Sequence, residues 1–202
     1  MNNEQNTTSQ RQNRTKAHLK KALIDLIKEK GYHSVTVKDL VDYAAYNRST
    51  FYIHYTDKIE LAEDLLVSML QGLEASVGKA YVPGQKVNTA KLNAPSFNIV
   101  SYIYKNQSFF TLINYDDTLP GLHTRFPQTI LKIYKEQFIF ETINNMPVNM
   151  DYFKRYTAYG FYGLLHTWIE NGFKETPEDF IQEVIDLTKT HIHSFQFIGH
   201  NK

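Results

Sequence analysis

Several side chains that donate hydrogen bonds stand close together after residue 47. They are Arg48, Ser49, Tyr52, His54 and Lys58. Guanidinium, hydroxyl, imidazole and ammonium groups are the donors that proteins direct to base edges and phosphate oxygens. On a short helix that begins near Asn47, Phe51 and Tyr55 would point inward and leave the donors on the outer edge. The pattern therefore predicts a helix suited to lie in the major groove of DNA.

Two short helices and the turn between them must position these donors. Thr36 is a good N-cap for the first helix, and Asp39 follows at the spacing of a capping box. The inward stripe of that helix is apolar and consists of Val37, Leu40, Val41 and Ala44. Residues 45–47 make the turn, and Asn47 can cap the second helix.

A longer helix is expected on each side of this pair. Thr15 can cap the first, which runs to about residue 30 and ends at Gly31 because glycine tolerates a left-handed helix end. Its apolar residues recur at spacings of three and four: Leu19, Ala22, Leu23, Leu26 and Ile27. Another helix follows over 58–80. Residues 1–13 lack periodicity, and we expect a disordered tail there.

Composition excludes several classes of protein. Hydrophobic residues make up 42% of the 202 residues and charged residues 21%, as in ordinary globular proteins. The absence of cysteine excludes disulfides, thiolate metal sites and a cysteine nucleophile. No apolar run approaches the roughly 18 residues of a membrane helix. The polar N-terminus is unlike a secretion signal. We therefore expect a cytoplasmic protein without a membrane partner.

Positive charge is concentrated toward the N-terminus. The net charge is +1, but residues 1–60 hold ten Lys or Arg against seven Asp or Glu. Five of these cations precede or open the first long helix: Arg11, Arg14, Lys16, Lys20 and Lys21. They suit phosphate contacts, which make affinity salt-dependent. The alternative is a solvated helix face.

A run of positions between 31 and 58 resembles a known family. They are Gly31-Tyr32, Val35-Thr36-Val37, Leu40, Ala44, Thr50-Phe51-Tyr52, His54-Tyr55 and Lys58. In type and spacing they resemble the DNA-binding domain of the TetR/AcrR family of bacterial transcription regulators, over about residues 15–66. The chain departs from the family at Ala45, where glycine is usual and some strain is expected, and at Tyr46, which implies a wider pocket under the recognition helix.

The resemblance implies an all-α fold with two domains. A three-helix helix-turn-helix DNA-binding domain would occupy 14–58, and a helical ligand-binding and dimerisation domain 59–202. It also implies eight DNA-binding residues: Thr36, Lys38, Arg48, Ser49, Thr50, Tyr52, His54 and Lys58.

Separate roles follow for some of these eight residues. Arg48 is suited to guanine O6 and N7. Thr50 would touch a thymine methyl or a phosphate, while Tyr52, His54 and Lys58 would hold phosphates. For Lys38, Tyr52 and His54 the alternative is an ordinary surface or half-buried side chain.

Helical patterns continue after a loop over residues 81–95. We expect helices at 96–106, 107–115, 120–145, 149–171 and 177–194. The last has a clear start, because Thr176 can cap it, Pro177 fits its first position and Asp179 completes a capping box.

Aromatic residues are frequent in this second half. In the family, a small effector binds between the helices of this domain, which implies an aromatic-lined pocket. Its expected residues are Tyr102, Phe109, Phe110, Phe126, Phe138, Tyr159 and Tyr162. The alternative for each is an ordinary core position.

Residues 160–173 resemble a subgroup that includes the regulator of dihydroxyacetone kinase genes. In such proteins the last two long helices pair with their twins in a homodimer. Gly160 and Gly163 would allow close approach there, and Leu165 and Trp168 would supply apolar area. A two-fold operator suits a two-fold protein.

The resulting interpretation is a DNA-binding regulator, a repressor released from a palindromic operator by an unknown small-molecule effector. The alternative is an activator, or a regulator controlled by a protein partner. We expect no enzyme, metal or cofactor, because the eight histidines lack a ligand spacing and no catalytic or phosphate-loop motif occurs. A scaffold that has lost DNA binding is a further alternative.

Overall fold

A computed structural model describes residues 2–199 of the chain. Met1 and residues 200–202, which the expected tail and C-terminal domain include, lie outside the described residues. The chain divides into two compact units. The N-terminal unit comprises Met1–Met69 together with Leu112–Leu122, and the helical unit comprises Leu70–Thr111 and His123–Lys202.

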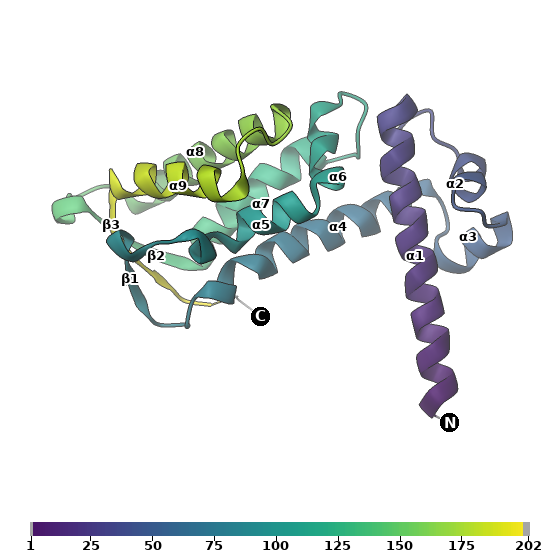
Figure 1. Cartoon of the computed structure of the whole chain (residues 1–202), viewed down its shortest axis with the longest axis horizontal. Coiled ribbons are helices and arrows are strands. Elements are labelled where there is room, and N and C mark those ends of the chain that lie inside the picture. Colours follow the sequence, from purple (N-terminus) through teal and green to yellow (C-terminus); the bar gives the residue numbers. More distant parts are fainter. Residues whose placement is uncertain (1, 200–202) are drawn as a thin grey trace. The chain divides into compact units, whose positions relative to one another are not determined.

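The N-terminal unit contains the expected helices. They are α1 (Asn2–Lys30), α2 (Val37–Tyr43), α3 (Arg48–His54) and the first part of α4 (Lys58–Val77). Figure 1 shows α2 and α3 together on one side of α1. The structure differs from our expectation of a disordered tail, because α1 is helical from Asn2. Residues 2–13 contain no glycine or proline to end that helix.

Apolar stripes close the core of this unit. Leu19, Leu23 and Ile27 of α1 are fully buried, as are Leu40 of α2 and Phe51 of α3. Burying five such side chains contributes about 1.5–3 kcal/mol each. This core fixes how α3 is presented to its surroundings.

The helical unit contains the remaining elements. Its α-helices after α4 are α5 (Asn98–Lys105), α6 (Gln107–Phe110), α7 (Leu122–Glu136), α8 (Met150–Glu170) and α9 (Pro177–Lys189). Its strands are β1 (Lys86–Asn88), β2 (Phe138–Thr142) and β3 (Ile192–Phe197). Short 3-10 helices lie at Gly78–Ala80, Thr89–Lys91, Ala94–Phe97, Thr111–Asn114 and Ile143–Asn145. The cap at the start of α9 is confirmed, since Thr176 accepts from the Asp179 amide.

The strands form a small antiparallel sheet in the order β1-β3-β2. The fold is mostly helical, but our all-α expectation overlooked this sheet. The helices expected at 120–145 and 177–194 end at Glu136 and Lys189, and a strand follows each. Buried and exposed residues alternate from Phe138 to Phe140, which is the period of a strand and not of a helix.

An aromatic cluster holds the sheet in the unit. Phe138 lies within 5.5 Å, centroid to centroid, of both Phe195 and Phe197 on the neighbouring strand. Tyr81 lies edge-on to Phe195 at 5.4 Å. Such ring pairs add about 0.5–1.5 kcal/mol beyond the area they bury.

Candidate nucleic-acid interface

The start of α2 is held by a complete capping box. The Thr36 side chain accepts from the Asp39 amide, and the Asp39 carboxylate accepts from the Thr36 amide at 2.8 Å and its hydroxyl at 2.7 Å. Lys30 also pairs with Asp39 at 2.8 Å. Hydrogen bonds from Lys30 and Thr36 hold the pKa of Asp39 far below its usual range. Asp39 therefore remains a carboxylate that stabilises the helix N-terminus.

Asn47 caps the recognition helix α3. Its side-chain oxygen accepts from the Thr50 amide at 2.8 Å, the Thr50 hydroxyl at 2.8 Å and the Ser49 hydroxyl at 2.7 Å. Ser49 and Thr50, both expected to touch DNA, thus use their hydroxyl protons in the cap. Their hydroxyl oxygens can still accept hydrogen bonds.

The two faces of α3 differ sharply in exposure. Phe51 is fully buried, and Tyr55 beyond the helix end is 2% exposed with its hydroxyl donating to Asp64 at 2.7 Å. Tyr52 and Ile53 are 57% and 71% exposed. The inward and outward assignment made from the sequence is confirmed for these four residues.

Arg48 and Lys38 are exposed, but they differ in their partners. Lys38 pairs with Asp42 at 2.8 Å. Arg48, the first residue of α3, makes no ion pair with any residue that the structure describes. Its guanidinium is the more available donor for a base edge.

His54 and Lys58 lie at the C-terminal side of α3. Burial and the charge of Lys16 lower the pKa of His54, so its ring is neutral at pH 7 and can donate a single hydrogen bond. The Lys58 ammonium donates to the Tyr32 carbonyl at 2.8 Å and lies over the Tyr32 ring at 4.2 Å. In this conformation Lys58 is turned to the protein rather than freely presented for a phosphate.

The turn between α2 and α3 is strained at Ala45. Its φ is +56°, in the left-handed region that favours glycine. Tyr46, in the same turn, is half-buried, and its hydroxyl lies 2.9 Å from His18 Nδ1. The strain expected from the sequence at Ala45 is therefore present.

Replacing Ala45 with glycine should stabilise the protein by about 1 kcal/mol, because it removes the left-handed Cβ penalty. Urea unfolding monitored by circular dichroism measures this change. Ala44→Gly is the matched control, since Ala44 has an ordinary φ of −81°. An A45G protein no more stable than the wild type would contradict the prediction.

Four of the cations of α1 fall into two groups. Lys20 pairs with Asp64 and Lys21 with Asp25. Arg11 and Arg14 are exposed, and the described residues offer them no ion pair. The two arginines are thus free to meet an external anion.

Comparison with known proteins agrees with this geometry. Residues 20–65 match the family model described as bacterial regulatory proteins, tetR family. Residues 96–190 match a second model, a transcriptional regulator C-terminal region. The chain belongs to the TetR family of transcriptional regulators. Members of this family are regulators that bind DNA and typically dimerise, and they are not enzymes.

Individual relatives are distant. The chain is 22% identical, over 85% of its length, to the uncharacterized HTH-type transcriptional regulator YxbF of Bacillus subtilis (strain 168), and spans 44% of that protein. It resembles the structure of a TetR regulator from Streptococcus agalactiae 2603V (24% identity, TM-score 0.59, 90% and 97% of the two chains). It also resembles the dihydroxyacetone kinase operon activator DhaS (17%, 0.59, 87% and 94%).

The residues expected to line an effector pocket do not form one lining. Tyr102, Phe109, Phe110, Phe126 and Tyr162 pack ring against ring, with Phe110 5.2 Å from Phe126 and Phe126 5.4 Å from Tyr162. Tyr159 is 47% exposed. Phe138 alone of the seven lines a cavity of about 60 Å³, together with Tyr81, Tyr134, Phe161 and Phe195. The helical periodicity did not distinguish core packing from a cavity wall.

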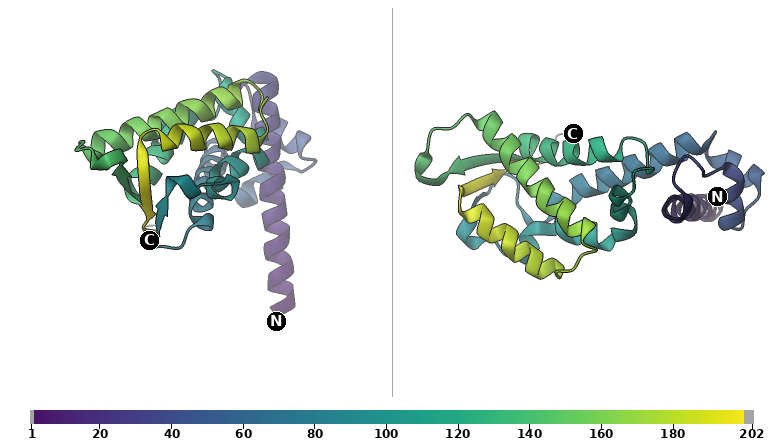
Figure 2. Two further views of the ribbon diagram at one scale, coloured as in Figure 1. Left: turned by 60° about the vertical axis from the view of Figure 1, so that its left-hand side comes forward. Right: turned by 90° about the horizontal axis from the view of Figure 1, so that it is seen from above.

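The expected dimer residues separate onto two faces of α8. Leu165 and Trp168 are buried in the protomer, so our expectation that they supply apolar area to a partner was wrong. Gly160 and Gly163 face open space, with nothing within 4 Å of an added Cβ. Figures 1 and 2 show α8 and α9 next to each other. Leu164 and Leu187 flank a groove between them.

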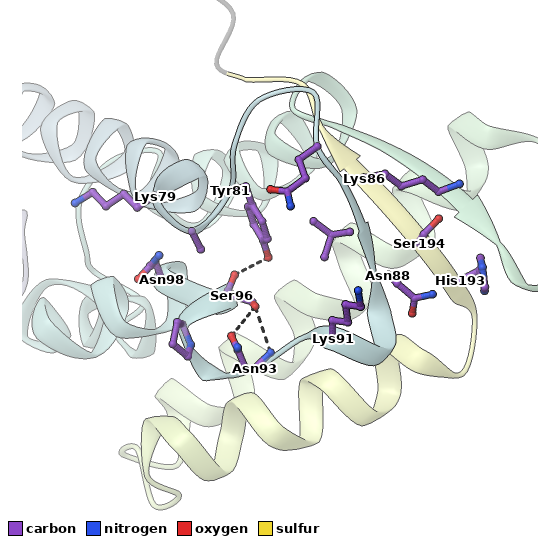
Figure 3. Close-up of a pocket in the computed structure, with 14 residues that line it drawn as sticks. Lys79, Tyr81, Lys86, Asn88, Lys91, Asn93, Ser96, Asn98, His193 and Ser194 are labelled. Carbon is purple, nitrogen blue, oxygen red and sulfur yellow. Dashed lines mark hydrogen bonds between the residues drawn. The ribbon is translucent and has the colours of Figure 1, made fainter.

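A larger polar hollow of about 730 Å³ lies beside β1 (Figure 3). Lys79 and Lys86 extend in opposite directions away from it, and Lys86 pairs with Glu141 at 2.6 Å. The charged groups do not converge, and we assign it no ligand. Among the described residues, no cluster of three potential metal ligands occurs, and no helix has the length and apolarity to cross a membrane.

Proposed function

We propose that this chain is a homodimeric repressor that reads a two-fold operator with α3 and leaves it when an effector binds the helical unit. The observation that carries the proposal is the way α3 packs on the N-terminal unit. Buried Phe51 anchors the helix while unpaired Arg48 and exposed Tyr52 face outward. A duplex supplies the acceptors that these outward donors lack.

The DNA contacts divide by chemistry. Arg48 reads a base, because a guanidinium can donate to guanine O6 and N7 together. Ser49, Thr50 and Thr36 accept hydrogen bonds at the helix starts, because their hydroxyl protons already bind Asn47 and Asp39. Lys38, Tyr52 and His54 hold phosphates on either side and fix the register of the helix. Lys58 would reach a phosphate after its ammonium leaves the Tyr32 carbonyl.

The dimer surface is the exposed face of α8 with the neighbouring part of α9. Tyr156 is 75% exposed, Leu164 37% and Leu187 47%. Because Gly160 and Gly163 have no side chain and face open space, a second helix could pack close to α8 there. A partner copy would cover this apolar face. A two-fold operator would offer each protomer one half-site, and the half-sites would lie about 34–36 Å apart or a multiple of that.

Release follows if an effector favours a different setting of α4. That helix is continuous from Lys58 to Val77, so it enters both units. Some ligands would bind more tightly to a state in which the spacing of the two α3 helices does not fit the operator. Such a ligand lowers DNA affinity by up to the ratio of its affinities for that state and for the DNA-binding state.

Control by a protein partner is the second candidate. The observation that favours it is the aromatic cavity of about 60 Å³, which is small beside the roughly 300 Å³ of ordinary ligand pockets. DhaS is named as an operon activator, so activation is the alternative to repression for this chain.

Selection of bound fragments from the chromosome of the source bacterium tests the function. We expect enrichment of an inverted repeat, and a reporter fused to that fragment should be silenced by the protein. A reporter that is switched on would assign activation instead of repression. Absence of any enriched fragment would contradict operator binding.

Arg11 and Arg14 should add phosphate contacts at the N-terminal end of α1. Replacing both with alanine is expected to reduce the slope of log affinity against log salt by roughly 0.9 for each phosphate that is no longer neutralised. Titrations at several salt concentrations on operator and random DNA measure it. The control is Lys79→Ala with Lys91→Ala, which removes two cations from the helical unit. Equal slopes in both double variants would contradict the assignment.

A further inference from the structure

A segment from the second half of the chain is built into the N-terminal unit. Leu112–Leu122 folds with α1, α2 and α3, although α6 before it and the rest of α7 after it belong to the helical unit. Its apolar residues are buried: Leu112, Ile113, Leu119 and Leu122. The segment is therefore an integral part of the unit that carries α3.

Asp117 of this segment forms hydrogen bonds with the turn between α1 and α2. Its backbone carbonyl accepts from the Tyr32 amide at 3.0 Å. Its carboxylate accepts from the His33 amide at 3.1 and 3.2 Å and also contacts His33 Nδ1. Backbone and side chain of one residue thus bind two consecutive residues of the turn.

Gly31 gives the carboxylate its space. Its φ is +78°, and an added Cβ would lie within 3.1 Å of three side-chain atoms of Asp117. A side chain at position 31 would both strain the turn and displace Asp117. The glycine that ends α1 therefore also admits this contact.

Lys58 binds the same turn as a hydrogen-bond donor, whereas Asp117 binds it as an acceptor. It donates to the carbonyls of Tyr32 and His33, at 2.8 and 3.4 Å, while Asp117 accepts from their amides. Burial acts to raise the pKa of Asp117, but the His33 hydrogen bonds and the charge of Lys58 outweigh it and lower that pKa. Asp117 stays ionised at neutral pH. We call Gly31, Tyr32, His33, Lys58 and Asp117 the Asp117 cluster.

The cluster lies where the helix-turn-helix joins its neighbours. Thr36, the cap of α2, follows His33 by three residues, and Lys58 opens α4 soon after α3 ends at His54. Both ends of the α2–α3 pair are therefore attached to it. Along the chain, Asp117 lies between the 3-10 helix Thr111–Asn114, which follows α6, and the start of α7.

We propose that Asp117 is a positioning residue for operator recognition, which sets the α2–α3 pair by holding the Gly31–His33 turn against Lys58. Its segment lies between α6 and α7 in the chain. The inference rests on the proposed operator binding and adds the residue that controls it.

The test compares Asp117→Asn with Asp116→Asn. Asp116 is the exposed neighbour in the same segment, with no hydrogen bond or ion pair to any described residue. Each variant removes one negative charge, so simple electrostatics predicts equal or tighter DNA binding for both. Positioning predicts instead that D117N lowers operator affinity about tenfold while D116N does not. Random-DNA affinity should change little in either, so the specificity ratio falls only in D117N.

A second variant keeps the test valid if D117N folds poorly. His33→Ala leaves both backbone hydrogen bonds to Asp117 in place. It removes the ring contact with Asp117 and the edge-on packing of the ring against Tyr32. We expect it to lower operator affinity a few-fold, and the H33A/D117N pair to lose less than the two single effects combined. Circular dichroism checks that each variant is folded.

The outcomes separate the two proposals. If the wild type binds no operator, the proposed function fails first. If it binds and D117N matches D116N in affinity and specificity ratio, operator binding stands and the role of Asp117 is overturned. Additive H33A and D117N effects would likewise contradict a shared cluster.

Discussion

Arg48→Ala is expected to weaken operator binding by about 5- to 150-fold for each half-site, the value of one bidentate base contact. A dimer presents Arg48 twice, so the loss on the whole operator is roughly the square of that factor. The reason is that Arg48 opens α3, is exposed and has no ion-pair partner among the described residues. Binding to random DNA should fall only slightly, because each protomer then lacks just one charge that attracts phosphate.

Arg48→Lys separates charge from base reading. Lysine keeps the positive charge but cannot donate with the planar fork of a guanidinium. We therefore expect R48K to restore random-DNA affinity and to leave most of the operator loss. Fluorescence anisotropy with operator, base-substituted operators and random DNA measures all three affinities. Equal losses on operator and random DNA for R48A would refute a base-reading role.

The second large effect is expected at the α8 surface. Leu164→Asp should weaken dimerisation at least about 100-fold, because the dimer would bury an unpaired carboxylate twice. Leu164 is 37% exposed in the protomer, so the substitution leaves the protomer core intact. Operator affinity should fall with the dimer, since a monomer grips one half-site only.

Light scattering coupled to size-exclusion chromatography measures this change in oligomeric state. Lys174→Glu is the control, because it also adds a carboxylate on an exposed residue but lies beyond the C-terminus of α8. The wild type and K174E should be dimers at concentrations where L164D is monomeric. A dimeric L164D protein that binds the operator normally would place the interface elsewhere.

Local signals in the sequence predicted most of the DNA-binding unit. The spacing of Thr36 and Asp39 predicted a capping box, and the cap by Asn47 and the burial of Phe51 followed from the same short-range rules. These features depend on residues a few positions apart. Their chemistry is therefore visible without the fold.

Features that depend on distant residues were not predictable in this way. His33 and Asp117 are 84 positions apart, and nothing in either neighbourhood marks the contact. β1 pairs with β3 across about half the chain, so neither strand has a local partner. The alternation of β2 was present in the sequence, but the strong stripe of the preceding helix concealed it.

The second error was to assign residues from both faces of α8 to the dimer interface. Leu165 and Trp168 share a face with buried Phe161, whereas Gly160 and Leu164 lie on the exposed side. Apolar residues on both faces of a helix fit either a core or an interface. Only the packing of α8 in the fold decides which side is left open.

Two-fold operator binding is tested most sharply by a hydroxyl-radical footprint of the wild-type protein on its selected operator, with the number of bound protomers measured in parallel. We expect two protomers and two symmetric protected half-sites about 34–36 Å apart or a multiple of that, with weaker protection of both half-sites in R48A. A single protected site bound by one protomer, or a footprint unchanged by R48A, would contradict it.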